Sequence, residues 1–238
     1  MKFCKLPCIL LAFAVCLFAT QVVASEQYYF AADEVLDSGT LLPAPPQEGS
    51  TLFANDKAKY EEGLSLRQTP RGDIAAADAD QKKVHEAFAE AFGHPISAEK
   101  TPALYALVNR VGRECRRATH AAKRLHSRIR PYVMYKANTC FRKTEDVLRN
   151  TGSYPSGHSS NGWGVALVLA EINPARKDAL FARGYEYGQS RVICGYHWQS
   201  DVDAARLIAS ACVAMLHANP HFVDDLNKAR EEFAKLRF

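Results

Sequence analysis

The sequence predicts an all-α fold, a bundle of helices joined by short connections. Alternation of apolar and polar residues, which is typical of half-buried strands, never extends beyond a few positions. Helix start and stop signals instead recur along the chain, with apolar residues at helical spacing between them. Such segments bury their apolar faces against one another, so we expect packed helices without a sheet.

The N-terminal residues are typical of a secretory signal peptide. Residues 1–5 carry two lysines, residues 6–20 are almost wholly apolar, and residues 22–24 are small side chains before the expected cleavage point. A transmembrane anchor is the alternative, but the apolar run is short for the roughly 20 residues that span a bilayer. We therefore expect residues 1–24 to be a signal peptide and residues 25–238 to form a single domain.

The first part of this domain is predicted to be an extended arm followed by a helix. Residues 39–49 contain three prolines and are expected to lie extended over the domain surface. Residues 73–92 are rich in alanine and other good helix formers, which predicts the first helix. This helix is expected to end at Gly93, with Pro95 behind it, because glycine suits a C-cap and proline cannot continue a helix.

The remaining helices are predicted from their caps and from apolar spacing. Thr101 is a capping residue followed by proline at the first helical position, and the helix it starts is expected to run towards Arg128. An apolar stretch after Ser156 predicts a third helix. Three more are expected from Asn173 to Tyr187, from Ser200 to Leu216, and along the C-terminal stretch after Pro220.

Cysteine usage permits disulfides in the mature domain. Three of the seven cysteines lie in the predicted signal peptide, which leaves Cys115, Cys140, Cys194 and Cys212. Four cysteines in an oxidising compartment allow two disulfides in three connectivities, and buried free thiols are the alternative. A metal site is disfavoured because no His or Cys pairs have zinc-like spacing.

The charge and hydropathy of the chain limit the classes of binding partner. The formal net charge is +4, but no run of lysines and arginines and no interleaved aromatic pattern is present. No second apolar stretch is long and uncharged enough to span a bilayer. We therefore expect neither nucleic-acid binding nor membrane attachment after signal cleavage.

The first of three separated polar clusters is Lys123 with Arg130. The two residues are seven apart, so they are predicted to project from nearly the same face of a helix that ends before Pro131. Arginine offers a planar fork of donors to phosphate oxygens, and lysine offers a compact charge. The alternative is a solvated basic face, because the segment also contains Arg116, Arg117, Arg124 and Arg128.

The second cluster precedes the apolar helix. Ser156 can cap that helix, and the backbone N–H groups of Gly157 and His158 are then directed out of its start. Such a helix start binds anions through exposed donors and the helix dipole, and glycine lets the backbone approach a ligand closely. The alternative is an ordinary capped turn that carries an incidental histidine.

The third cluster comprises Arg191, His197 and Asp201. His197 and Asp201 are four residues apart, so on a helix they share a face. A carboxylate that holds one ring nitrogen fixes the tautomer and leaves the other nitrogen free to act as a nucleophile. The alternative is an exposed pair at helical spacing.

Together the clusters resemble a known signature. It is that of the superfamily that joins type 2 phosphatidic acid phosphatases, bacterial non-specific acid phosphatases and vanadium-dependent haloperoxidases. The flanking sequences 152–154 and 195–199 look like those of the class A bacterial acid phosphatases. The signature positions present here are Lys123, Arg130, Pro131, Pro155, Ser156, Gly157, His158, Ser190, Arg191, His197 and Asp201.

The resemblance implies a helical bundle of the acid phosphatase and haloperoxidase type, and a two-step phosphoryl transfer. His197 is expected to attack phosphorus, His158 to protonate the leaving group and then activate water, and Asp201 to orient His197. Phosphoryl transfer depends chiefly on positioning and on neutralising charge, so no metal or other cofactor is expected. The residues expected to hold the phosphate oxygens are Lys123, Arg130, Ser156, Gly157 and Arg191.

The expected function is that of a secreted, periplasmic acid phosphatase with a broad range of phosphate monoesters. Acid pH is expected because His158 must be protonated while His197 must be free. The resemblance also implies a homodimer or larger homo-oligomer. Alternatives on the same site are an apyrase-like nucleotide phosphohydrolase or phosphotransferase, a vanadate-dependent haloperoxidase, a lipid phosphatase and a phosphate-binding protein without activity.

Overall fold

The structure is a computed structural model that describes residues 27–80 and 83–236. Every regular element in these two ranges is a helix, so the predicted all-α class is confirmed. The predicted signal peptide, residues 1–24, lies outside the described residues. No helix in the described ranges has the length and apolarity needed to cross a membrane.

The α-helices follow one another in the order α2 (Ser38–Leu41), α3 (Thr51–Ser65), α4 (Pro70–Ala77), α5 (Val84–Phe92), α6 (Pro102–Arg117), α7 (His120–His126), α8 (Pro131–Met134), α9 (Glu145–Arg149), α10 (Gly157–Ile172), α11 (Lys177–Ile193), α12 (Gln199–Leu216) and α13 (Pro220–Ala234). Short 3-10 turns, Arg142–Thr144 and Pro174–Arg176, lead into α9 and α11.

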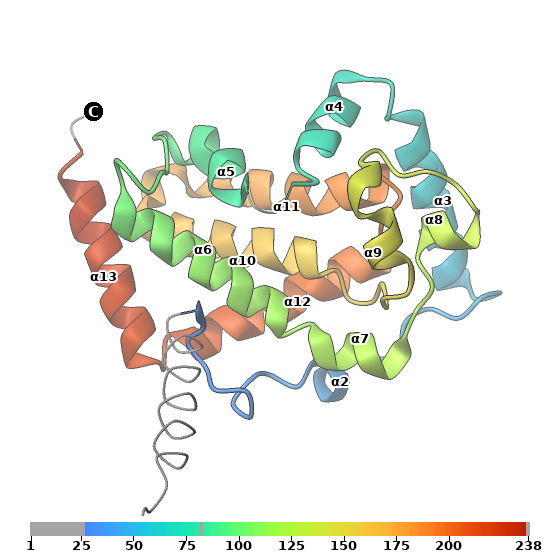
Figure 1. Cartoon of the computed structure of the whole chain (residues 1–238), viewed down its shortest axis with the longest axis horizontal. Helices are drawn as coiled ribbons and strands as arrows, with labels where there is room; N and C mark the ends of the chain where they lie inside the picture. Colours follow the sequence, from blue (N-terminus) through green and yellow to red (C-terminus); the bar gives the residue numbers. More distant parts are fainter. Residues whose placement is uncertain (1–26, 81–82, 237–238) are drawn as a thin grey trace, which may run out of the picture.

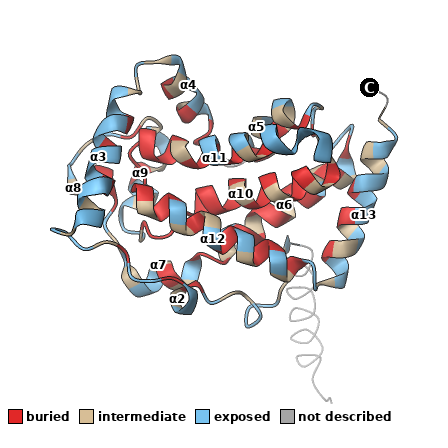
Figure 2. Cartoon of the chain, turned by 180° about the vertical axis from the view of Figure 1, so that it is seen from behind, coloured by how far each residue is buried: buried red, intermediate tan, exposed pale blue. Residues whose placement is uncertain are grey.

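Helix α10 lies at the centre of the bundle, with α11, α6 and α12 packed around it (Figure 1). It is buried along almost its whole length (Figure 2). Small residues allow this: a Cβ added at Gly162 would lie 2.2 Å from a ring carbon of Tyr187, and one at Gly164 would lie 2.4 Å from the sulfur of Cys115. The close packing of α6 and α11 on α10 fixes the start of α10, where the predicted anion site lies.

The apolar core continues towards α5 and α13, at the end of the bundle away from α7 and α9 (Figure 1). Phe88, Phe92 and Phe222 are fully buried there. Burial of each such side chain stabilises the fold by about 1.5–3 kcal/mol. The bundle is therefore anchored at one end by aromatic packing, and its other end is available for polar groups.

A disulfide between Cys140 and Cys194 joins the segment after α8 to the end of α11, with Cα atoms 4.7 Å apart. Cys115 and Cys212 are free thiols, and both are buried in the core. Of the two disulfides that the sequence permits, the structure contains one.

Two predicted helices are each broken into two. The segment predicted as one helix over 73–92 forms α4 and α5. The break follows Asp78, because its carboxylate accepts hydrogen bonds from Arg183 and Ser190 on α11. The helix predicted to run towards Arg128 ends at Arg117, and the chain continues as α7. Near that break the hydroxyl of Thr119 donates to the carbonyl of Arg116, 2.7 Å away, in a local bond that favours a helix end.

Candidate active site

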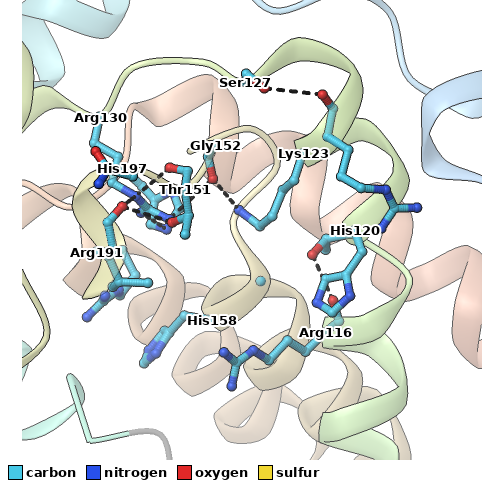
Figure 3. A pocket seen from close by; sticks show the side chains of 15 residues that line it. Arg116, His120, Lys123, Ser127, Arg130, Thr151, Gly152, His158, Arg191 and His197 are labelled. Atoms are coloured by element: carbon cyan, nitrogen blue, oxygen red, sulfur yellow. Dashed lines mark hydrogen bonds between the residues drawn. The ribbon is translucent and has the colours of Figure 1, made fainter. Parts of the chain in front are cut away.

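The three clusters from separate parts of the sequence meet at one cavity of about 400 Å³ (Figure 3). Its walls come from α6, α7, the segment 148–152 and the start of α10, and from Arg130, Arg191 and His197. Ser156 and Asp201 do not line the cavity themselves. The predicted residues that line the cavity are Lys123, Arg130, Gly157, His158, Arg191 and His197.

His197 is buried and lies just before α12. Its Nδ1 is 3.2 Å from Oδ2 of Asp201, and the same oxygen accepts the backbone N–H of Trp198 at 2.9 Å. The expectation that the pair shares a helix face was wrong, because only Asp201 belongs to the helix. The contact arises instead from the helix start, where Asp201 occupies a position that suits a capping carboxylate.

The other ring nitrogen of His197 is held by a cation. Nη1 of Arg130 lies 3.1 Å from Nε2 of His197. A guanidinium can only donate, so Nε2 accepts with its lone pair, and the ring proton is then on Nδ1, facing Asp201. Burial lowers the pKa of His197 well below its usual value, and Arg130 and Lys123 lower it further. His197 is therefore a neutral imidazole whose Nε2 lone pair accepts a hydrogen bond from Arg130, and this bond must open before Nε2 can attack phosphorus.

Lys123 and Arg130 do not share a helix face, contrary to the sequence expectation. Lys123 is on α7, whereas Arg130 is an extended residue directly before α8, with Pro131 as the first residue of that helix. The two side chains converge because both donate to the carbonyl of Gly152, Lys123 Nζ at 3.0 Å and Arg130 Nη2 at 3.2 Å. The loop before α10, and not helical periodicity, brings them together.

Every N–H group of Arg130 already has an acceptor. Nε donates to the carbonyls of Leu148 and Thr151. Nη1 donates to the carbonyl of Tyr196 and to Nε2 of His197. Nη2 donates to the hydroxyl of Thr151 and to the carbonyl of Gly152. An oxygen of a bound phosphate must therefore share or displace one of these acceptors. Arg130 acts first as a fixed positive charge beside His197.

Arg191 differs from Arg130 because two of its nitrogens have no partner. It is buried at the end of α11, and its guanidinium lies 3.9 Å from the centre of the Tyr196 ring. Nε and Nη1 are both buried without an acceptor among the described protein atoms. Burial lowers its pKa to about 10. Because unsatisfied buried donors are costly, this side chain is the clearest sign that the cavity is built for an anion.

The start of α10 has the predicted cap. The Ser156 hydroxyl accepts the backbone N–H of Ser159 at 3.2 Å, and the N–H of Ser156 donates to the carbonyl of Asp201 at 2.8 Å. The next N–H groups, of Gly157 and His158, belong to the first helical turn, which lacks intrahelical acceptors. Ser156 thus caps the helix, and the backbone N–H groups of Gly157 and His158 are the donors available to an anion.

His158 is held by a ring contact and not by hydrogen bonds. It stacks on Tyr187 with ring centres 4.1 Å apart and an interplanar angle of 11°. Both of its ring nitrogens are buried without a partner among the described protein atoms. Burial lowers its pKa well below the usual value, and Arg191 and His197 lower it further. We therefore expect His158 to act in its protonated form only when a phosphate is bound, because the phosphate dianion offsets the positive charges around the ring.

Two residues that support Asp201 were not predicted. Arg128, counted in the sequence as part of a basic face, donates to Asp201 Oδ1 and to Asp56 Oδ2, both at 2.7 Å. Asp56 in turn accepts the backbone N–H of Ser200 at 2.8 Å. All three charged groups are buried or nearly so. Asp56 lies on α3, far from the motifs in sequence, and no local pattern links it to them.

The pH dependence of turnover follows from the two histidines. Since both pKa values lie below the ordinary 6.5, kcat/KM is expected to peak below that pH. Activity falls at lower pH as His197 gains a proton, and at higher pH as His158 loses one. Profiles measured with two esters of different phosphate pKa separate enzyme ionisation from substrate ionisation. A maximum above pH 7 for both esters would contradict these assignments.

Comparison with known proteins adds a family match. The sequence model of the PAP2 superfamily matches residues 103–224, just over half of the chain. A non-specific acid phosphatase from Providencia stuartii is 53% identical over 215 residues, which cover 89% of this chain and 87% of that protein. A non-specific acid phosphatase from Salmonella typhimurium is 39% identical, covering 87% and 84%. An acid phosphatase from Zymomonas mobilis is 36% identical, covering 90% and 80%.

Proposed function

The chain belongs to the PAP2 superfamily and is an acid phosphatase of the bacterial non-specific class, and on this premise we propose that His197 cleaves phosphate monoesters through a phosphohistidine. The observation that carries the proposal is the arrangement of the His197 ring. Asp201 holds Nδ1, and His197 lines a cavity with unpaired donors, where a phosphate that takes over the Arg130 donor frees the lone pair of Nε2. A neutral imidazole in this position is an activated nucleophile.

In the first step, the phosphoryl oxygens bind the free N–H groups of Arg191 and the backbone N–H groups of Gly157 and His158. Nε2 of His197 forms a bond to phosphorus as the bond from phosphorus to the ester oxygen breaks. The electron pair stays on the ester oxygen, which takes the proton of His158. Asp201 stabilises the positive charge that the phosphorylated ring acquires.

In the second step, His158 takes a proton from water, and the water oxygen forms a bond to phosphorus. The N–P bond breaks, its electron pair returns to Nε2 of His197, and inorganic phosphate leaves. The proton that His158 receives restores the acid for the next turnover. The stack on Tyr187 keeps the His158 ring in place for both transfers.

We also propose that the protein acts in the periplasm on small phosphate esters. The expected signal peptide and the Cys140–Cys194 disulfide support that location, since disulfides persist in oxidising compartments. The homodimer or larger homo-oligomer implied by the resemblance stays a prediction that sedimentation can test.

Hydrolysis of p-nitrophenyl phosphate, with and without vanadate and EDTA, tests this function. Vanadate mimics the trigonal-bipyramidal phosphoryl centre and is expected to inhibit by competing with substrate, as transition-state analogues do. EDTA is expected to have no effect, because His197 and the cationic groups perform the chemistry. Loss of activity in EDTA that added metal restores would overturn the proposed mechanism. Halide oxidation by peroxide with added vanadate would favour the haloperoxidase alternative.

A further inference from the structure

Helix α7, which carries Lys123, is capped by a distant residue and not by its own N-cap. Thr119 occupies the N-cap position in a helical conformation, and its hydroxyl donates to the carbonyl of Arg116 at 2.7 Å. The N–H of Ala122, in the first turn of α7, donates instead to the hydroxyl oxygen of Ser38, 3.1 Å away and 84 residues earlier in the chain. An N-cap side chain normally accepts the N–H at this position of a helix. Ser38 therefore supplies the cap that Thr119 does not.

The contact between Ser38 and α7 is buried and well supported. Ser38 and Ala122 are both fully buried, so water cannot replace the hydroxyl as an acceptor. Ser38 is the first residue of α2, and Asp37 caps that helix by accepting the N–H of Gly39 at 2.9 Å. Helix α2 packs against α7 (Figure 1). A Cβ on Gly39 would lie 3.4 Å from a methyl carbon of Leu125, so the two helices are in close contact.

The segment that contains Ser38, residues 37–43, also reaches the loop that Lys123 contacts. Nζ of Lys123 donates to the carbonyls of Gly152 and Ser153 at 3.0 and 3.2 Å (Figure 3). An ammonium group has three N–H donors, so these two carbonyls leave one for a phosphate oxygen. The next residue, Tyr154, donates its hydroxyl to the carbonyl of Pro43 at 3.0 Å. Segment 37–43 thus contacts both the helix that carries Lys123 and the loop that orients its ammonium group.

We propose that Ser38 is a positioning residue for phosphate binding, which acts by fixing the start of α7 and with it the side chain of Lys123. The proposal rests on the function proposed above. Ser38 does not line the cavity, so it cannot contact the phosphate itself. Ala122 directly precedes Lys123, so a shift of the first turn of α7 displaces the residue that carries the ammonium group. A misplacement of about 1 Å at a binding group is enough to weaken its contribution severely.

A double-mutant cycle with Lys123 tests the proposal, with the Kd of orthovanadate measured by isothermal titration calorimetry. Ser38→Ala is expected to raise this Kd by about 3- to 10-fold, a part of the roughly 10- to 100-fold that a hydrogen bond to a charged group contributes. In a Lys123→Ala background the same substitution is expected to change the Kd by less than about twofold, because the side chain that Ser38 positions is absent. An equal rise in both backgrounds, or no rise in either, overturns the inference.

Thr101→Val is the matched control. Thr101 is also fully buried, and its hydroxyl accepts the backbone N–H of Ser97 at 2.9 Å. It directly precedes α6, about 24 Å from the other end of that 16-residue helix. The variant is expected to lose stability in urea as Ser38→Ala does, but to keep the vanadate Kd within about twofold of the wild-type value.

Tyr154→Phe is a second variant that perturbs the same segment with little risk to folding. It removes the hydrogen bond to the carbonyl of Pro43, and it is expected to raise the vanadate Kd only where Lys123 is present. A rise of the same size in the Lys123→Ala background would contradict the role of segment 37–43. Failure of the wild type to bind vanadate or to hydrolyse p-nitrophenyl phosphate overturns the proposed function instead.

Discussion

Replacement of His197 by alanine is expected to lower kcat for p-nitrophenyl phosphate by at least about four orders of magnitude. The reason is that Nε2 is the atom that forms the covalent bond to phosphorus, and nothing else at that point of the cavity can replace it. Arg130, its neighbour at 3.1 Å, only donates. Steady-state kinetics with an active-site titration for contaminating wild type measures the loss.

His217→Ala is the matched control for this substitution. His217 follows α12 and lies 3.0 Å from a carboxylate oxygen of Glu171, so it is also a histidine beside an acid. It is at the opposite end of an 18-residue helix, about 27 Å from its start. The kcat of the His217→Ala variant is expected to stay within about twofold of the wild-type kcat, as for a surface substitution. Substantial activity in a folded His197→Ala protein would exclude His197 as the nucleophile.

Arg128→Ala is expected to lower the free energy of unfolding by about 3–5 kcal/mol. The substitution leaves Asp56 and Asp201 as buried carboxylates without their shared cation, and their side chains are 1% and 0% exposed. It also frees Asp201 from one of the contacts that orient it toward His197, so kcat is expected to fall with stability. Urea unfolding at pH 7 measures the first effect.

A substitution of a neighbouring arginine that contacts neither carboxylate is the control for that loss. Arg124→Ala removes an exposed arginine that forms no ion pair with a carboxylate of the described residues, and it should cost no more than about 0.5 kcal/mol. Equal losses in both variants would contradict the proposed support of Asp201.

The fold class and the start of α10 were predictable because both depend on local sequence, whereas the meeting of the three clusters was implied by the family resemblance. Caps and apolar spacing identify helices, and the start of α10 after Ser156 follows from a serine whose hydroxyl accepts the N–H of Ser159. The position of Asp201 next to His197 follows from a spacing of four residues, although the turn that joins them precedes the helix. Short-range chemistry of this kind is readable from one chain.

What could not be predicted depends on contacts between distant segments. The convergence of Lys123 and Arg130 is produced by the carbonyl of Gly152, which no helical periodicity encodes. The role of Arg128 depends on Asp56, which reaches it through the packing of α3 against the start of α12. In sequence Arg128 is one basic residue among several, and only its burial distinguishes it.

The phosphohistidine is the central claim, and trapping it is the most direct test. His158→Ala removes the group that activates water but leaves His197 intact, so the covalent intermediate should accumulate with p-nitrophenyl phosphate, whose leaving group needs little protonation. Alkaline quenching, which preserves phosphohistidine, followed by peptide mass spectrometry and ³¹P NMR, locates the phosphoryl group. We expect it on Nε2 of His197. A phosphoryl group on any other residue, or turnover by this variant with no covalent adduct at His197, would contradict the account.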